Sequence, residues 1–125
     1  MSGVKKVILI VDDTPDNILL LSGLLKDNYK IKAATNGEKA IVIANKTPPP
    51  DLILLDVVMP EIDGYAVCET LKHHELTKNI PIIFVTGNAS DAEKQHGFSL
   101  GAIGYLGKPV DSAQLFDIIQ KTLGN

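Results

Sequence analysis

The sequence predicts an α/β fold, a doubly wound five-stranded parallel sheet with helices on both faces. Strand-like and helix-like segments alternate five times along 125 residues, a length that suits one domain with one core. Four of the strand-like segments are short apolar runs without polar alternation, as strands buried on both faces require, and the second, at 29–34, is a weaker strand. The five segments cover residues 7–11, 29–34, 52–55, 82–85 and 103–106.

A helix-like segment with a recognisable start follows each strand. Pro15 suits the first turn of the first helix, because its missing N–H would have no partner there. Asn36 and Asp111 are expected to cap the second and fifth helices. Ser90 and Glu93 have the spacing of a capping box, in which each side chain bonds the backbone N–H of the other residue.

Composition excludes several classes of protein. The net charge of -3 and the absence of a Lys/Arg stripe argue against direct binding of nucleic acid. The apolar runs are too short to span a membrane, and we expect no signal peptide. The single cysteine, Cys68, is expected to be a small buried hydrophobic residue in a cytoplasmic protein. The prolines at 48–50 suit a stiff loop, so residues 1–125 are predicted to form one domain.

Polar side chains stand where the predicted strands end. Asp12 and Asp13 follow the first strand, Asp56 the third, Thr86 the fourth and Lys108 the fifth. The carboxyl ends of parallel strands share one edge of the sheet, where α/β proteins bind their ligands. We therefore expect three carboxylates, one hydroxyl and one ammonium to lie together.

This set of groups favours a magnesium site for phosphoryl transfer. Crowded carboxylates repel one another unless positive charge lies among them, and Mg²⁺ prefers oxygen ligands. The residues at 73, 74 and 96 are histidines without zinc-ligand spacing and are expected to be exposed. A cation and a lysine can neutralise a moving phosphoryl group while a carboxylate attacks it. The spacing alone leaves open which aspartate is the nucleophile.

Over nearly its whole length the chain resembles the receiver domains of bacterial two-component response regulators, the CheY-like family. Together, the order and spacing of five short motifs are specific to that family. The motifs are Val11-Asp12-Asp13, Asp56-x-x-Met59-Pro60-x-x-Asp63-Gly64, Val85-Thr86-Gly87, Gly101-Ala102-x-Gly104-Tyr105-Leu106 and Lys108-Pro109. The resemblance implies a flavodoxin-like (βα)5 fold with strand order 2-1-3-4-5.

The resemblance also implies how the acidic residues act. Asp56 would be the phosphoacceptor, modified by a phosphohistidine of a histidine kinase or a histidine phosphotransfer protein. Asp13 would bind Mg²⁺ (or Mn²⁺) directly and Asp12 largely through water, while Asp56 and the backbone carbonyl of Val58 complete the shell. Asp63 is expected to cap a helix or shape a turn.

Three further residues would complete the switch. Lys108, joined to the next residue by a cis X-Pro bond, would pair with the acyl phosphate, and Thr86 would hydrogen-bond a phosphoryl oxygen. Tyr105 would turn inward as Thr86 moves.

The fourth helix, weakened by Gly97, is our expected bistable element. The family uses the face formed by helix four, strand five and helix five for output domains and homodimers, and Ile103 there departs from many relatives.

Two other functions remain as alternatives. A flavodoxin-like carrier of a small molecule would need a phosphate-binding loop rich in Ser, Thr and Gly, but residues 12–15 read Asp-Asp-Thr-Pro. A magnesium-dependent phosphatase would need a second acid/base carboxylate in the loop of its nucleophile, but Val57 and Val58 follow Asp56. We therefore predict a self-phosphorylating and self-dephosphorylating switch rather than a turnover enzyme.

Overall fold

The computed structural model describes residues 5–124 as five parallel strands in the order β2-β1-β3-β4-β5. This arrangement confirms the predicted fold class. The order changes direction at β1, whose neighbours β2 and β3 lie on opposite sides of it. Sheets of this kind bind their ligands at the strand ends beside such a point. The strands are β1 (Val7–Val11), β2 (Lys30–Ala34), β3 (Leu52–Leu55), β4 (Ile82–Thr86) and β5 (Gly104–Gly107).

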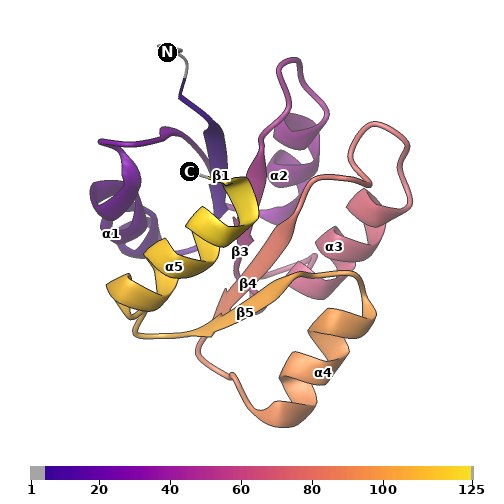
Figure 1. Ribbon diagram of the computed structural model, residues 1–125. Coiled ribbons are helices and arrows are strands. Elements are labelled where there is room, and N and C mark those ends of the chain that lie inside the picture. The colour runs from indigo at the N-terminus through magenta and orange to yellow at the C-terminus, as the bar shows by residue number, and fades with distance from the viewer. Residues whose placement is uncertain (1–4, 125) are drawn as a thin grey trace.

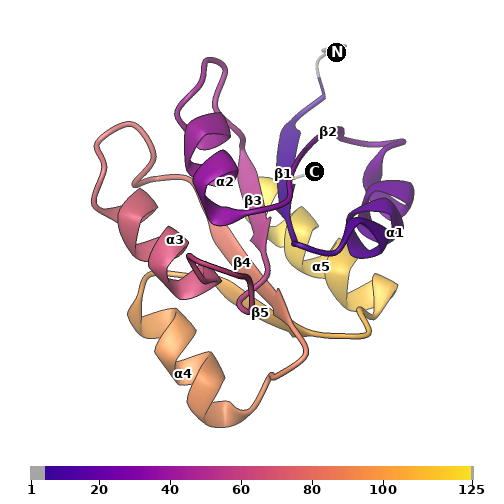
Figure 2. The ribbon, with the colours of Figure 1, turned by 180° about the vertical axis from the view of Figure 1, so that it is seen from behind.

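Five helices cover the sheet in two layers. One layer holds α1 and α5, and the other holds α2, α3 and α4 on the opposite face (Figure 1 and Figure 2). No helix in the range 5–124 is long and apolar enough to cross a membrane. The helices are α1 (Pro15–Leu25), α2 (Gly37–Ala44), α3 (Gly64–Lys72), α4 (Asp91–Ser99) and α5 (Ser112–Leu123).

The central strands are buried along their whole length, which explains their unbroken apolar sequence. Alternate side chains of β1 point to opposite faces, so Leu9 packs with α2 and α3 while Ile8 and Ile10 pack with α1 and α5. The sheet therefore separates two apolar clusters. This packing on both faces holds the strand ends, and the side chains that follow them, in fixed positions.

The observed helix caps agree with those predicted from the sequence, except at α4. The side chains of Asn36, Asp63 and Asp111 accept backbone N–H bonds at the starts of α2, α3 and α5. Ser90 accepts the Glu93 N–H at 3.3 Å, but the expected reciprocal bond is missing. The Glu93 carboxylate instead accepts a hydrogen bond from a tyrosine hydroxyl of α3, because tertiary packing brings that stronger partner within reach.

The fifth strand lies one residue further along the chain than predicted. It covers Gly104–Gly107, and Ile103 before it is exposed. The backbone pairing explains the shift, because Thr86 of β4 is in register with Gly107 and its carbonyl accepts the Lys108 N–H at 2.9 Å. A glycine contributes little strand propensity, so the sequence pattern ended too early.

Gly64 allows the chain after β3 to fold back tightly. A Cβ at this position would clash with the backbone oxygen of Asp56, and the Gly64 N–H donates to the Val57 carbonyl at 2.7 Å. We predict that Gly64→Ala lowers the free energy of unfolding by about 1–3 kcal/mol or more, because the contact is with backbone that cannot rotate away. Urea denaturation measures this change.

Gly23→Ala is the matched control, since a Cβ at this exposed position of α1 meets nothing within 4 Å. This change should raise the free energy of unfolding by up to about 1 kcal/mol through better helix propensity. Equal effects of the two substitutions would contradict the steric role of Gly64.

Candidate functional site

The edge formed by the strand ends holds the five side chains that the sequence singled out. Asp12 and Asp13 follow β1, Asp56 follows β3, Thr86 ends β4 and Lys108 follows β5. Backbone bonds continue past the strands, because Asp56 N–H donates to Val11 O at 2.9 Å and Lys108 N–H to Thr86 O at 2.9 Å. The functional side chains are thus carried by paired backbone rather than by free loops.

The three carboxylates form one cluster, with an oxygen from each lying within 4.8 Å of the others. Asp12 is 2% exposed and Asp56 is 5% exposed, whereas Asp13 faces solvent. The Thr14 N–H donates to Asp12 Oδ1 at 2.9 Å. The Nζ atom of Lys108 lies 2.8 Å from Asp12 Oδ2 and 3.4 Å from Asp56 Oδ1. One ammonium therefore bridges the two buried carboxylates.

The charges within this cluster are not balanced. Burial, followed by the charge of Asp12, raises the pKa of Asp56, although Lys108 opposes this effect. Burial alone would lower the pKa of Lys108, but the hydrogen bond that Lys108 donates to Asp12 and the charge of Asp56 outweigh it and raise the pKa. Three carboxylates facing one ammonium leave excess negative charge, which a cation at this point would offset.

The donor set fits a hard divalent cation. Carboxylate oxygens are the ligands that Mg²⁺ prefers, and an exposed carboxylate such as Asp13 leaves room for metal-bound waters. His73, His74 and His96 are exposed, as expected. Cys68 is buried, also as expected, and burial raises the pKa of its thiol to about 11. The acidic cluster can therefore hold a metal of the magnesium type.

Thr86 and Tyr105 are linked through the loop between β4 and α4. Thr86 is 1% exposed, and its Oγ1 accepts the Asn88 N–H at 3.4 Å. The Tyr105 hydroxyl donates to the Asn88 carbonyl at 3.2 Å, and the tyrosine ring is turned inward and 8% exposed. The bond between Lys108 and Pro109 is cis, as the resemblance implied.

Sequence reasoning missed the residues around the Tyr105 hydroxyl. Tyr65, in the first turn of α3, lies with its hydroxyl oxygen 2.8 Å from that of Tyr105 and donates to the Glu93 carboxylate. Burial raises the pKa of both tyrosines, so both hydroxyls keep their protons at neutral pH. A tyrosine directly after the Asp63-Gly64 motif was the available signal, but nothing in the sequence paired it with Tyr105.

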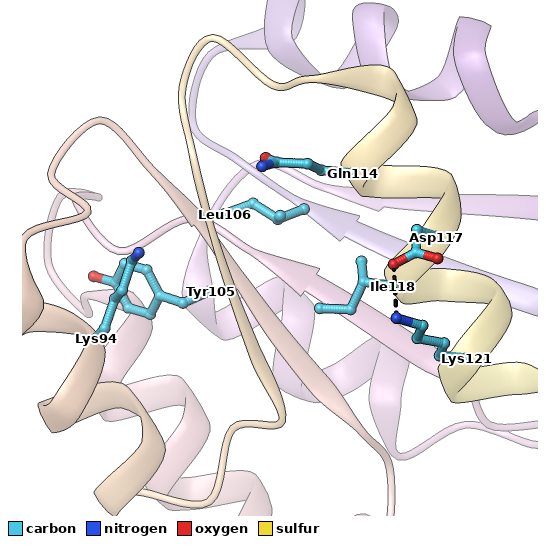
Figure 3. A pocket seen from close by; sticks show the side chains of 7 residues that line it. All are labelled: Lys94, Tyr105, Leu106, Gln114, Asp117, Ile118 and Lys121. Atoms are coloured by element: carbon cyan, nitrogen blue, oxygen red, sulfur yellow. Dashed lines mark ion pairs between the residues drawn. The ribbon is translucent and has the colours of Figure 1, made fainter.

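The face formed by α4, β5 and α5 contains a groove beside Tyr105 (Figure 3). An ion pair between Asp117 and Lys121 of α5, with 3.0 Å between Oδ2 and Nζ, borders the groove. Ile103, expected to alter this face, is 48% exposed. The groove is lined by Lys94, Tyr105, Leu106, Gln114, Asp117, Ile118 and Lys121.

An acidic cluster with a bridging lysine on a doubly wound sheet defines a class of phosphorylation-dependent signalling domains. The family model of the response regulator receiver domain matches residues 8–120. The chain belongs to this family, whose members act in two-component signalling. Receiver domains typically bind Mg²⁺ and interact with histidine kinases and output domains.

Individual proteins agree with this assignment. The chain is 47% identical over 94% of its length to the Vibrio cholerae protein named "Probable cyclic di-GMP phosphodiesterase", and covers 26% of that protein. It is 36% identical to protein PilH of Pseudomonas aeruginosa, with 93% of this chain and 96% of PilH covered. The chain spans about a quarter of the Vibrio relative and nearly all of PilH.

A solved structure shares the fold of this chain. The receiver domain of a sensor histidine kinase from Pseudomonas aeruginosa has a TM-score of 0.87 and 29% identity to this chain. The match covers 98% of this chain and 100% of the other. That domain was crystallised with a magnesium ion coordinated in its active-site cleft.

The raised pKa of Asp56 predicts a pH-dependent gain of stability in Asp56→Asn without metal. Ionised Asp56 costs the folded state stability at neutral pH, where asparagine carries no charge. The melting temperature of Asp56→Asn in EDTA at pH 7 should therefore be higher by an amount on the order of a few degrees. Below about pH 4 the aspartate is protonated in both folded and unfolded chains, so the gain should disappear.

Thermal melts in EDTA between about pH 3 and pH 8 measure this difference. Asp27→Asn, which removes an equal charge at an exposed turn after α1, is the matched control and should show no such pH-dependent gain. A variant less stable than the native chain at pH 7 would contradict the view that buried charge destabilises the site.

Proposed function

We propose that Asp56 accepts a phosphoryl group from a phosphohistidine of a histidine kinase or a histidine phosphotransfer protein. The observation that carries this proposal is the buried Asp56 carboxylate, which lies 3.4 Å from the Lys108 ammonium and beside the oxygens of Asp12 and Asp13. Burial and the charge of Asp12 raise the pKa of Asp56. A raised pKa makes the Asp56 oxygen a more basic nucleophile than an ordinary aspartate.

Asp12, Asp13, Asp56 and the backbone carbonyl of Val58 would hold the magnesium ion, Asp13 directly and Asp12 largely through water. Val58 follows Asp56 by two positions in the same loop, and its side chain is exposed. The bound cation would neutralise charge on the phosphoryl oxygens as the group is transferred. Manganese has the same preference for oxygen ligands and would serve as a substitute.

The residues of the chain then have separate tasks. An Asp56 oxygen forms the new bond to phosphorus while the bond from phosphorus to the partner's imidazole nitrogen breaks, and the imidazole leaves with the bonding electrons. Lys108, which bridges Asp12 and Asp56, turns its ammonium to a phosphoryl oxygen. Thr86 donates its hydroxyl to another phosphoryl oxygen. Water later cleaves the acyl phosphate and resets the switch.

The signal would leave through the face formed by α4, β5 and α5. Movement of Thr86 would displace the loop whose Asn88 carbonyl accepts from Tyr105, so the phosphoryl group and Tyr105 are coupled. Gly97 is the only buried residue of α4, which makes this helix easier to shift than the deeply packed α3. An output domain or a second copy of the chain would bind this face.

Phosphoryl transfer can be tested with a small donor. Incubation with acetyl phosphate and Mg²⁺ should add one phosphoryl mass to the native chain, and Asp56→Asn should abolish the addition because its amide oxygen is a poor nucleophile. Intact mass spectrometry measures both. Asp27→Asn lies in the turn before the start of β2, at the edge of the sheet opposite to the strand ends, and should be phosphorylated like the native chain. Equal modification of Asp56→Asn would sink the assignment of Asp56.

Metal binding can be tested separately from phosphorylation. Asp13→Asn should melt within about a degree of the native chain in EDTA, because Asp13 is exposed and lies outside the buried pair. Added Mg²⁺ should raise the melting temperature of the native chain and of Asp27→Asn but not of Asp13→Asn. Retained stabilisation of Asp13→Asn by Mg²⁺ would show that Asp13 is not a ligand.

A further inference from the structure

Tyr65 belongs to α3, which takes no part in the link between Thr86 and Tyr105, but its side chain contacts Tyr105. Its hydroxyl oxygen lies 2.8 Å from that of Tyr105 and donates to the Glu93 carboxylate of α4. Its ring makes edge contacts with Phe84 of β4, at 5.1 Å between centroids, and with His96 of α4, at 4.5 Å. One side chain of α3 thus contacts β4, β5 and α4.

Counting protons assigns a direction to these hydrogen bonds. The Tyr65 hydroxyl donates to the Glu93 side-chain oxygen, which uses the single proton of Tyr65. The short contact between the two hydroxyls then requires Tyr105 to donate to Tyr65. Tyr105 has one hydroxyl proton, and the Tyr65 oxygen at 2.8 Å is a closer acceptor than the Asn88 carbonyl at 3.2 Å. The hydrogen bond from Tyr105 to Asn88 is therefore the weaker of the two.

The two acceptors of the Tyr105 proton belong to parts of the molecule that are anchored differently. Asn88 belongs to the loop after Thr86, so its carbonyl moves when that loop moves. Tyr65 belongs to α3, which is anchored through the buried Val67, Cys68 and Leu71. The stronger of the two bonds therefore restrains Tyr105 from a part of the molecule that does not depend on Thr86.

The position of Tyr105 also affects α4, because the tyrosine ring packs against Gly97. A Cβ at Gly97 would lie 3.0 Å from two atoms of the Tyr105 ring, so the ring packs directly against the backbone of α4. If Tyr105 left this position, α4 would lose that contact. Tyr65 would lose its hydroxyl partner while still holding Glu93, one turn earlier in the same helix.

We propose that Tyr65 is a positioning residue of the switch, whose hydroxyl holds Tyr105 inward and joins it to α4 through Glu93. This inference rests on the proposed function, since it concerns how Tyr105 responds to a phosphoryl group on Asp56. Tyr65 favours the inward arrangement before phosphorylation. It therefore reduces the free energy that the phosphoryl group must supply to complete the switch.

Linkage gives this restraint a measurable effect at the phosphorylation site. A phosphoryl mimic that favours inward Tyr105 must bind more weakly when inward Tyr105 is less populated. Loss of one net hydrogen bond of ordinary strength corresponds to an affinity about fivefold lower. Tyr65→Phe removes the hydroxyl but keeps the ring between Phe84 and His96. The mimic used is beryllofluoride in the presence of Mg²⁺.

Fluorine NMR of chains labelled with 3-fluorotyrosine observes Tyr105 directly, because the chain has only three tyrosines. In mimic-free Tyr65→Phe the Tyr105 resonance should shift toward that of an exposed tyrosine, and the dissociation constant for beryllofluoride should rise about fivefold. Tyr29→Phe is the matched control, since Tyr29 packs on the opposite face with α1 and α5. It should leave both readouts unchanged.

An unchanged Tyr105 resonance or an unchanged dissociation constant in folded Tyr65→Phe overturns the inference. If Tyr65→Phe fails to fold, Glu93→Ala tests the same restraint from α4 and should move both readouts in the same direction. If the native chain binds no beryllofluoride, the phosphoacceptor proposal fails. The Tyr105 resonance of the mimic-free chains still supports or overturns the restraint by Tyr65.

Discussion

The main physical constraint on this structure is the crowding of Asp12, Asp13 and Asp56 around the ammonium of Lys108, which the rest of the fold must hold in place. Parallel pairing forces the strand ends to one edge, and burial of Asp12 and Asp56 removes water that would otherwise screen their charges. The raised pKa of Asp56 is the direct result. The arrangement costs stability but concentrates basic oxygens where a cation and a phosphoryl group can bind.

The remainder of the fold supplies the rigidity that this crowding requires. Central strands buried on both faces anchor the edge, and the tight return of the chain at Gly64 packs against the Asp56 carbonyl. By contrast, α4 contributes only Gly97 to the buried interior. A rigid acidic cluster next to a lightly anchored helix is the division of stability that a switch needs, because the same input then moves one element and not the rest of the fold.

Hydrogen bonds connect the pocket to this helix without a break. They run from the Thr86 hydroxyl through the backbone of Asn88 to Tyr105, and from there through Tyr65 to Glu93. The first half of this route follows the loop beside the proposed phosphorylation site. The second half is anchored in α3. In the switch that we propose, Tyr105 lies between a loop that moves and a helix that stays in place, and their balance sets the population of its inward position.

The sequence by itself determined the fold class and the residues at the strand ends, because buried parallel strands have an unbroken apolar pattern and end at one edge. Only the tertiary structure decided that Tyr65 contacts Tyr105, 40 positions away. It also decided that Glu93 accepts a hydrogen bond from Tyr65 and not the capping-box bond that the sequence predicts. It also decided that Asp13 is exposed while Asp12 and Asp56 are buried. These features depend on the close approach of helices and on the orientation of side chains, which local sequence patterns do not encode.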